Sequence, residues 1–422
     1  MLALSGKTLF PLFSITSKRI FYLGQFGTTA TINIVCILAM FLLFMSKYKF
    51  INRKNTSLLS FFVILIILSL YSYFNPYNVI RSSFIPPLIY FLQILFFLYA
   101  IKVTFSDKEI FNSLYSAISI WVCFQLLLTI CYPILNIQSV LTLFHEGSEF
   151  WAERREGYHS ATGTFIHPAG LAYTISLYVL FYVASYFSSY RKLESLIYII
   201  IGLFIIVLTY SRSSYIALFI SISILLFTIF TTPQKTAWNI VVWIIGFIFI
   251  AFLLINISFF SDLFLKSDSA SMVEGRAIHL LMGWNLFQDY PILGTGINNH
   301  VYHLYNNLNM TAIYGEEIEF IIRSPIHNLH MIVLVETGVI GFSCWLLGIL
   351  YILRVLYKSV YLFQRKRVMC SAIVLSIIIF SIVYGFGGWS IFNYEVLTPL
   401  LVICMLTWNS SALVRYSTYN IS

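Results

Sequence analysis

The stretch that decides the fold is LIYIIIGLFIIVLTYSRSSYIALFISISILLFTIFT, residues 196–231. Its one charged side chain is Arg212. A helix needs about 20 apolar residues to cross the bilayer core, which is about 30 Å thick. The stretch is therefore too long for one span, and we predict two membrane helices joined by a tight turn near Arg212.

Apolar runs of this kind recur along the whole chain. Of its 422 residues, 59% are hydrophobic, 18% are aromatic and 10% are charged, whereas soluble domains are roughly one quarter charged. Because a soluble fold of this composition would aggregate, we exclude a soluble enzyme. We predict an all-α, polytopic integral membrane protein of about 11–12 transmembrane helices that forms a single membrane-embedded domain over residues 1–422. The expected spans centre near residues 37, 66, 93, 121, 174, 203, 222, 248, 340, 378 and 403.

The basic residues indicate a membrane topology and not nucleic-acid binding. The net charge is +9, but Lys and Arg lie in short connections between apolar runs. Loops rich in these residues stay in the cytoplasm, so we place the cluster at Lys358 and residues 365–367 inside. Alternation then puts two long, acidic loops outside, at residues 132–160 and 258–327, the second of them partly helical.

The N-terminus does not fit this alternation. Eleven spans leave it outside, although Lys7, Lys18 and Arg19 favour the cytoplasm. An additional weakly hydrophobic segment within residues 8–25 would give twelve spans and an inside start.

No pattern in the sequence predicts a metal or another cofactor. The six cysteines have no paired spacing, and the acids of the outer loops do not form an Asp-rich motif. We therefore expect no cofactor and no metal.

Of the eight histidines, which this topology places on or near the outer face, His327 has the most informative position. In Ser324-Pro325-Ile326-His327-Asn328, Pro325 suits the first turn of a helix, and the run from Leu329 is an expected span. Because an imidazole titrates near neutrality, a base at this boundary could take a proton from an acceptor hydroxyl. The alternative is an interfacial cap without a chemical role. For the histidines at 145, 159, 279, 300 and 303 we favour simple tolerance of polar loops.

Two arginines are candidates for binding an anion. Arg212 is costly at a span end without an anionic partner, and its planar fork matches phosphate oxygens. Arg276 opens a segment with apolar residues at helical spacing, which ends at Asp289-Tyr290-Pro291 and suits an amphipathic helix along the outer surface. The alternatives are a snorkelling Arg212 and a surface Arg276 that pairs with Glu274 or a lipid head group.

These three residues together indicate a reaction class. Two cations would neutralise a diphosphate leaving group while a base activates an acceptor hydroxyl, which suffices for displacement at an anomeric carbon without a metal. Residues 292–299 form a Gly-rich turn after the segment that Arg276 opens. This turn is weak evidence for a phosphate-binding loop.

The motifs around these residues resemble the O-antigen ligase and O-antigen polymerase superfamily of bacterial envelope glycosyltransferases. The matching elements are His327-Asn328 with Gly338 and Gly341 at the family spacing, Glu336 in Glu-Thr-Gly, Thr209-Tyr210-Ser211-Arg212, Gly275-Arg276, Pro291-x-x-Gly294-x-Gly296, and Gly163 to Pro168. Their order agrees with the family across roughly residues 150–350, which we take as its ligase-like core.

The resemblance implies a GT-C-like fold and specific roles. Arg212 and Arg276 would bind the pyrophosphate of an undecaprenyl-diphosphate-linked oligosaccharide or polysaccharide donor, and His327 would be the general base of a metal-independent, inverting transfer. Supporting positions would be Asn328, Ser211, Glu336, Gly338, Gly341, Gly294, Gly296, His167, Arg155 and Arg323. The enzyme would lie in the bacterial inner membrane with its active site facing the periplasm. Its partners would be a glycan or lipid A-core acceptor, membrane lipid, and chain-length regulator and flippase proteins.

Several activities share this signature. Polymerisation of O-antigen or capsular repeats, ligation to lipid A-core and protein glycosylation use the same donor, and we favour the first two because no added domain is present to dock a protein. A secondary transporter or flippase is the alternative class, with Arg212 and His327 as binding or proton-coupling groups. Glu336 is the one acid that we place inside a span, where it could also make a buried hydrogen bond. A non-enzymatic assembly protein is a third option.

Overall fold

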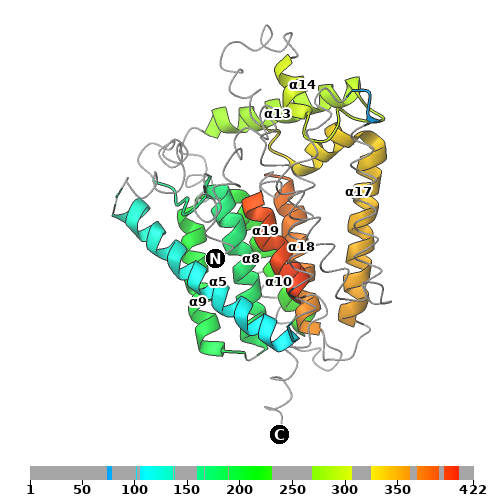
Figure 1. Cartoon of the computed structure of the whole chain (residues 1–422). Helices are drawn as coiled ribbons and strands as arrows, with labels where there is room; N and C mark the ends of the chain where they lie inside the picture. Colours follow the sequence, from blue (N-terminus) through cyan, green and yellow to red (C-terminus); the bar gives the residue numbers. More distant parts are fainter. Residues whose placement is uncertain are drawn as a thin grey trace, which may run out of the picture. The chain divides into compact units, whose positions relative to one another are not determined.

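The computed structural model describes residues 74–77, 101, 105–135, 137, 159–165, 167–188, 190–230, 269–306, 325–361, 368–388 and 394–407. All regular elements in these residues are helical (Figure 1). Within these described residues, four segments are long and apolar enough to cross a membrane: Lys108–Ile134, Pro168–Phe187, Arg212–Ile229 and Leu329–Leu356. The prediction of an all-α, polytopic membrane protein is confirmed.

The helices follow the apolar runs of the sequence. They are α5 (Asp107–Thr129, extended by a π-helical segment at Ile130–Ile134), α8 (Pro168–Phe187), α9 (Lys192–Leu208), α10 (Arg212–Phe230), α13 (Ser269–Asp289), α14 (His300–Asn306), α17 (Leu329–Tyr361), α18 (Val368–Gly385) and α19 (Tyr394–Thr407). Seven expected span centres, at 121, 174, 203, 222, 340, 378 and 403, lie in these helices. The centres near 37, 66, 93 and 248 and the segment 8–25 lie outside the described residues, so the total of 11–12 spans stays a prediction.

The chain divides into two compact units. The bundle unit consists of Ile101–Glu274 and Ile349–Ser422, and the histidine unit consists of Met1–Ala100 and Gly275–Gly348. We describe each unit by itself.

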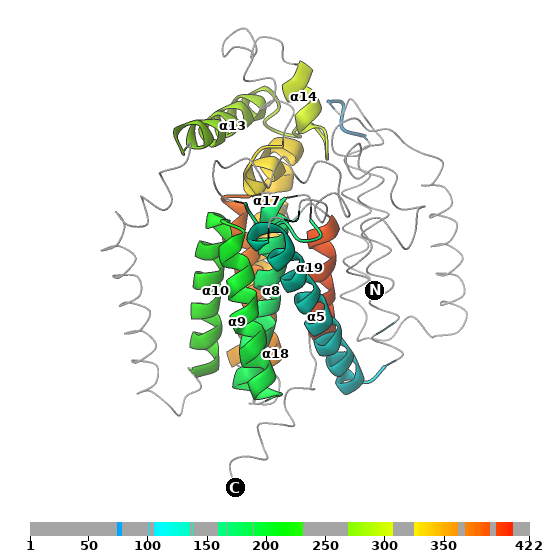
Figure 2. The same ribbon diagram turned by 90° about the vertical axis from the view of Figure 1, so that its left-hand side faces the viewer.

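Helix α8 is the centre of the bundle unit. It contacts α9, α10, α18 and α19 (Figure 2), and 17 of its 20 residues are buried. Gly202 of α9 permits close approach, because a Cβ there would lie 2.5 Å from Cγ2 of Val179. Some buried hydroxyls pair with those of neighbouring helices, as in the contact of Tyr182 with Ser119 at 2.9 Å. The sequence thus buries an apolar helix on nearly all sides.

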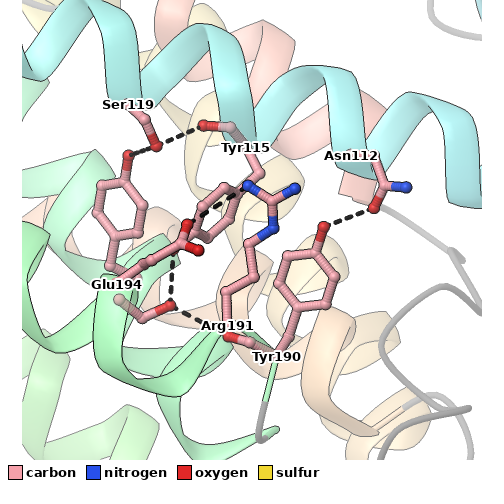
Figure 3. Close-up of polar contacts among 8 residues, drawn as sticks. Asn112, Tyr115, Ser119, Tyr190, Arg191 and Glu194 are labelled. Carbon is pink, nitrogen blue, oxygen red and sulfur yellow. Dashed lines mark hydrogen bonds and ion pairs between the residues drawn. The ribbon is translucent and has the colours of Figure 1, made fainter.

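A network of aromatic and polar side chains fixes the corner between α8 and α9 (Figure 3). Arg191 has a left-handed backbone with φ of 42°, and its guanidinium lies 5.2 Å from the ring centre of Tyr115 and 3.4 Å from Oε2 of Glu194. The Tyr190 hydroxyl donates to Oδ1 of Asn112 on α5 at 2.5 Å. The corner is therefore anchored to a neighbouring helix.

Candidate active site

The start of α17 fixes the backbone beside His327. Oδ1 of Asn328 accepts a hydrogen bond from the amide of Met331 at 2.9 Å, which makes Asn328 the N-cap of a helix that begins at Leu329. The expectation that Pro325 lies in the first helical turn is wrong, because the Asn328 side chain caps the helix three residues later. The helix cap that was the alternative role for His327 is provided by its neighbour, Asn328.

His327 contacts a second histidine, His279 of α13. The two ring centres are 4.9 Å apart at an interplanar angle of 14°, and the two Nδ1 atoms are 3.0 Å apart. The side chain of His279 is 4% exposed, so the expectation that it merely tolerates a polar loop is wrong. Sequence reasoning missed this residue, although its position three residues after Arg276 placed both on one face of the predicted helix.

Helix α13 carries His279 and confirms the predicted helix end at Asp289. Its buried face continues through Met282 and Leu286. Gly283 lies on the same face, where a Cβ would come within 2.8 Å of Cγ of Met331. The helix therefore packs closely against the start of α17. Arg276 lies in this helix, one turn before His279.

The Gly-rich turn after α13 packs against a break in α17. Gly338 has φ 62° and ψ −168° inside the helix, which the sequence did not predict. The carbonyls of Val335 and Glu336 accept hydrogen bonds from the amides of Thr295 and Gly296, each at 2.9 Å. The amide of Val339 donates to the carbonyl of Pro291, also at 2.9 Å. Two separate motifs, Pro-x-x-Gly-x-Gly and Glu-Thr-Gly, thus form one structural piece, the backbone lock of residues 291–296 and 335–339.

Only glycine fits at two positions of this backbone lock. Gly294 has φ of 63°, and a Cβ there would lie 2.5 Å from the carbonyl carbon of Glu336. At Gly338 a Cβ would lie 2.2 Å from the carbonyl oxygen of Ile292. The amides of Gly294, Thr295 and Gly296 are bonded within the protein, so these three amides serve packing and are not available to bind a phosphate.

Glu336 makes the buried hydrogen bond considered for it in the sequence. Its Oε1 is 2.6 Å from Nδ1 of His300 at the start of α14, and the two residues are 7% and 1% exposed. Nε2 of His300 is buried without a hydrogen-bond partner in the structure. His303, one turn further along α14, approaches the carbonyl of Tyr77 at 2.9 Å through Nε2, and burial lowers the pKa of its imidazole. The carboxylate of Glu336 is therefore held by His300 inside the histidine unit.

Arg212 lies in the bundle unit, at the predicted turn. Helix α9 ends at Leu208 and α10 begins at Arg212. Tyr210 has φ of 52°, and the hydroxyls of Ser211 and Ser214 are 2.9 Å apart. A cation in the first turn opposes the helix dipole, whereas an anion there is stabilised by it. Both the position and the charge of Arg212 therefore suit a bound phosphate.

The motif Gly163 to Pro168 anchors a loop of the bundle unit. Gln125 of α5 accepts a hydrogen bond from the amide of Thr164 at 3.1 Å, and Nδ1 of His167 accepts one from the amide of Ala169 at 3.0 Å. The amide of Ala161 donates to the carbonyl of Leu208 at 2.8 Å. This loop therefore meets the end of α9, just before the turn that carries Arg212.

The predicted site residues fall into two sets. The histidine unit holds His327, Asn328, Arg276, Glu336 and the four glycines 294, 296, 338 and 341, and the bundle unit holds Arg212, Ser211 and His167. Arg155 and Arg323 lie outside the described residues. Among the residues that are described, no group of three or more His, Cys, Asp or Glu side chains is placed to hold a metal ion.

Comparison with known proteins supports the reading of these motifs. Residues 197–346 match the family model of O-antigen ligase, and the match includes Arg212, Arg276 and His327. No curated protein matches the chain. Members of this bacterial envelope family are glycosyltransferase-type enzymes that use lipid-linked glycans. This chain is a multi-pass membrane protein in which residues 197–346 match the family model of O-antigen ligase.

Proposed function

We propose that the protein transfers a glycan from undecaprenyl diphosphate to a hydroxyl group of an acceptor at the periplasmic face of the inner membrane. The reaction is either polymerisation of O-antigen or capsular repeats or ligation of O-antigen. The observation that carries this proposal is the contact of His327, beside a capped helix start, with the helix on which Arg276 lies.

His327 is the general base in this proposal. The imidazole takes the proton of the acceptor hydroxyl as its oxygen forms a bond to the anomeric carbon. The bond from that carbon to the diphosphate oxygen breaks, and undecaprenyl diphosphate leaves with the electron pair. A single displacement of this kind inverts the anomeric configuration. A base held in position typically contributes about 10²–10⁴ to the rate.

The arginines stabilise the leaving group. Arg276 lies one turn before His279 on α13, and His279 contacts His327. In this proposal the Arg276 guanidinium supplies positive charge as the diphosphate departs. We assign Arg212 to the diphosphate because it lies in the first turn of α10, where the helix N-terminus stabilises an anion. Because arginine supplies the neutralising charge, the proposed displacement is metal-independent.

The test is transfer by the purified full chain in lipid nanodiscs. A lipid-diphosphate glycan and an acceptor are supplied, and release of undecaprenyl diphosphate is measured. We expect His327→Ala to reduce release by about 10²-fold or more, while His330→Ala, on the same helix, serves as the matched control. Full activity of His327→Ala would exclude His327 as the base, and a normal protein that releases no undecaprenyl diphosphate would favour a transporter.

A gene deletion separates polymerase from ligase. Loss of a polymerase leaves a single repeat on the lipopolysaccharide core, whereas loss of a ligase leaves bare core and long chains on carrier lipid. Unchanged lipopolysaccharide with altered protein glycosylation would reject both.

A further inference from the structure

We propose that His279 is a positioning residue that holds His327 in the tautomer required of a base. The inference rests on the proposed function of His327 and adds a second residue to it. His279 acts through the His327 ring and has no contact with the reacting atoms in this scheme.

A hydrogen bond joins the two rings through their Nδ1 atoms, which lie 3.0 Å apart. The ring centres are 4.9 Å apart and the ring planes are nearly parallel, at 14°.

One proton lies between the two Nδ1 atoms, and its position decides whether His327 can act. A neutral imidazole has one N–H and one lone pair. If Nδ1 of His327 donates, its Nε2 holds the lone pair and can accept a proton from a hydroxyl. If Nδ1 of His279 donates, Nε2 of His327 already carries hydrogen and cannot accept. Catalysis therefore requires His279 to be the acceptor.

The same contact supports the charged state that follows proton transfer. Once His327 has accepted a proton at Nε2, both of its nitrogens carry hydrogen, and Nδ1 still donates to His279. A hydrogen bond from a charged donor is roughly twice as strong as a neutral one. Because His279 must stay neutral to accept it, the pair holds only one extra proton.

The backbone on both sides keeps this contact in place. His279 is 4% exposed and lies on the face of α13 that packs into the unit. The absent side chain at Gly283 lets Ile326 and Met331 approach that face, and Asn328 caps the helix directly after His327. The two rings are therefore carried on segments that contact each other at several points.

Two substitutions of His279 separate hydrogen bonding from shape. His279→Leu removes the acceptor, and we expect kcat to fall by about tenfold or more, within the contribution of a positioned base, with an unchanged KM for the donor. His279→Asn places Oδ1 close to the former Nδ1 and should restore most of kcat. An unchanged kcat in His279→Leu, or equal losses in both variants, would overturn the positioning role.

Nitrogen-15 NMR of the full chain, labelled at histidine in nanodiscs, reports the tautomer without any substrate. The His327 signals are identified as those lost in His327→Gln. We expect hydrogen on Nδ1 and a lone pair on Nε2 in the normal protein, and a loss of this preference in His279→Leu. Hydrogen on Nε2 of His327 in the normal protein would overturn the inference. Because this NMR measurement needs no turnover, it tests the tautomer of His327 even if the proposed function fails.

Discussion

The two units of the protein use different means to hold their parts together. In the bundle unit, side chains make the contacts, such as Tyr182 with Ser119 and the Arg191 corner. In the histidine unit, backbone meets backbone at Gly294 and Gly338, and two imidazole contacts lie beside this backbone lock. Side-chain contacts tolerate replacement, whereas touching backbones leave no room for an added carbon atom. The histidine unit is therefore expected to be the more sensitive to small changes.

Substitution of Gly338 should have the largest effect. Gly338→Ala adds a Cβ that would lie 2.2 Å from the carbonyl oxygen of Ile292, at a residue with positive φ, so we expect little folded, active protein. Size-exclusion chromatography and the transfer assay measure this. Gly348→Ala in the same helix is the control, because a Cβ there meets nothing within 4 Å. Equal behaviour of the two variants would remove the contrast between the units.

Removal of the carboxylate of Glu336 should cost less. In Glu336→Ala the buried His300 loses the partner at 2.6 Å, and an unsatisfied buried group costs about 1–3 kcal/mol. Thermal unfolding in detergent should show a lower Tm, with Glu336→Gln closer to the normal protein because it keeps an acceptor. A large fall in kcat without a fall in Tm would instead give Glu336 a catalytic role.

Substitution of Arg212 tests chemistry in the bundle unit. Arg212→Lys keeps the charge but loses the planar fork, so we expect transfer to fall by about tenfold. Arg191→Lys, at the other end of α9, is the matched control because its guanidinium contacts Glu194 and aromatic rings. Similar activity of both variants would argue against a bidentate phosphate contact at Arg212.

The smallest effect is expected in the centre of the bundle. Tyr182→Phe removes the hydroxyl bonded to Ser119 at 2.9 Å, and hydrogen bonds between membrane helices average about 0.6 kcal/mol. Thermal unfolding should therefore change little, and transfer should stay normal. A loss as large as that of Glu336→Ala would contradict the proposed difference between the units.

Apolar runs and turn residues predicted much of the fold. The turn before Arg212 follows from the length of one apolar run, and the end of α13 follows from Asp289-Tyr290-Pro291. The break at Gly338 could not be read in this way, because the hydrogen bonds around it join residues 40 to 48 positions apart in the chain. A periodicity confined to one helix carries no information on such partners.

The candidate site, too, was predicted only in part, because contacts between distant residues do not show in a local sequence pattern. His327, Arg212 and Arg276 were found from their unusual positions in apolar surroundings and from family motifs, and the match over residues 197–346 covers all three. His279 was passed over because the ring that it contacts lies 48 residues away in the sequence. The sequence likewise did not reveal the packing role of the Gly-rich turn, because its amides donate hydrogen bonds to carbonyls of the distant helix α17.

The backbone lock also limits how this protein can be recombined with its relatives. Residues 291–296 and 335–339 share hydrogen bonds and a close approach of two glycines, so a crossover that takes one segment from each parent would join mismatched halves. Chimaeras made to exchange acceptor preference should inherit both segments from one parent.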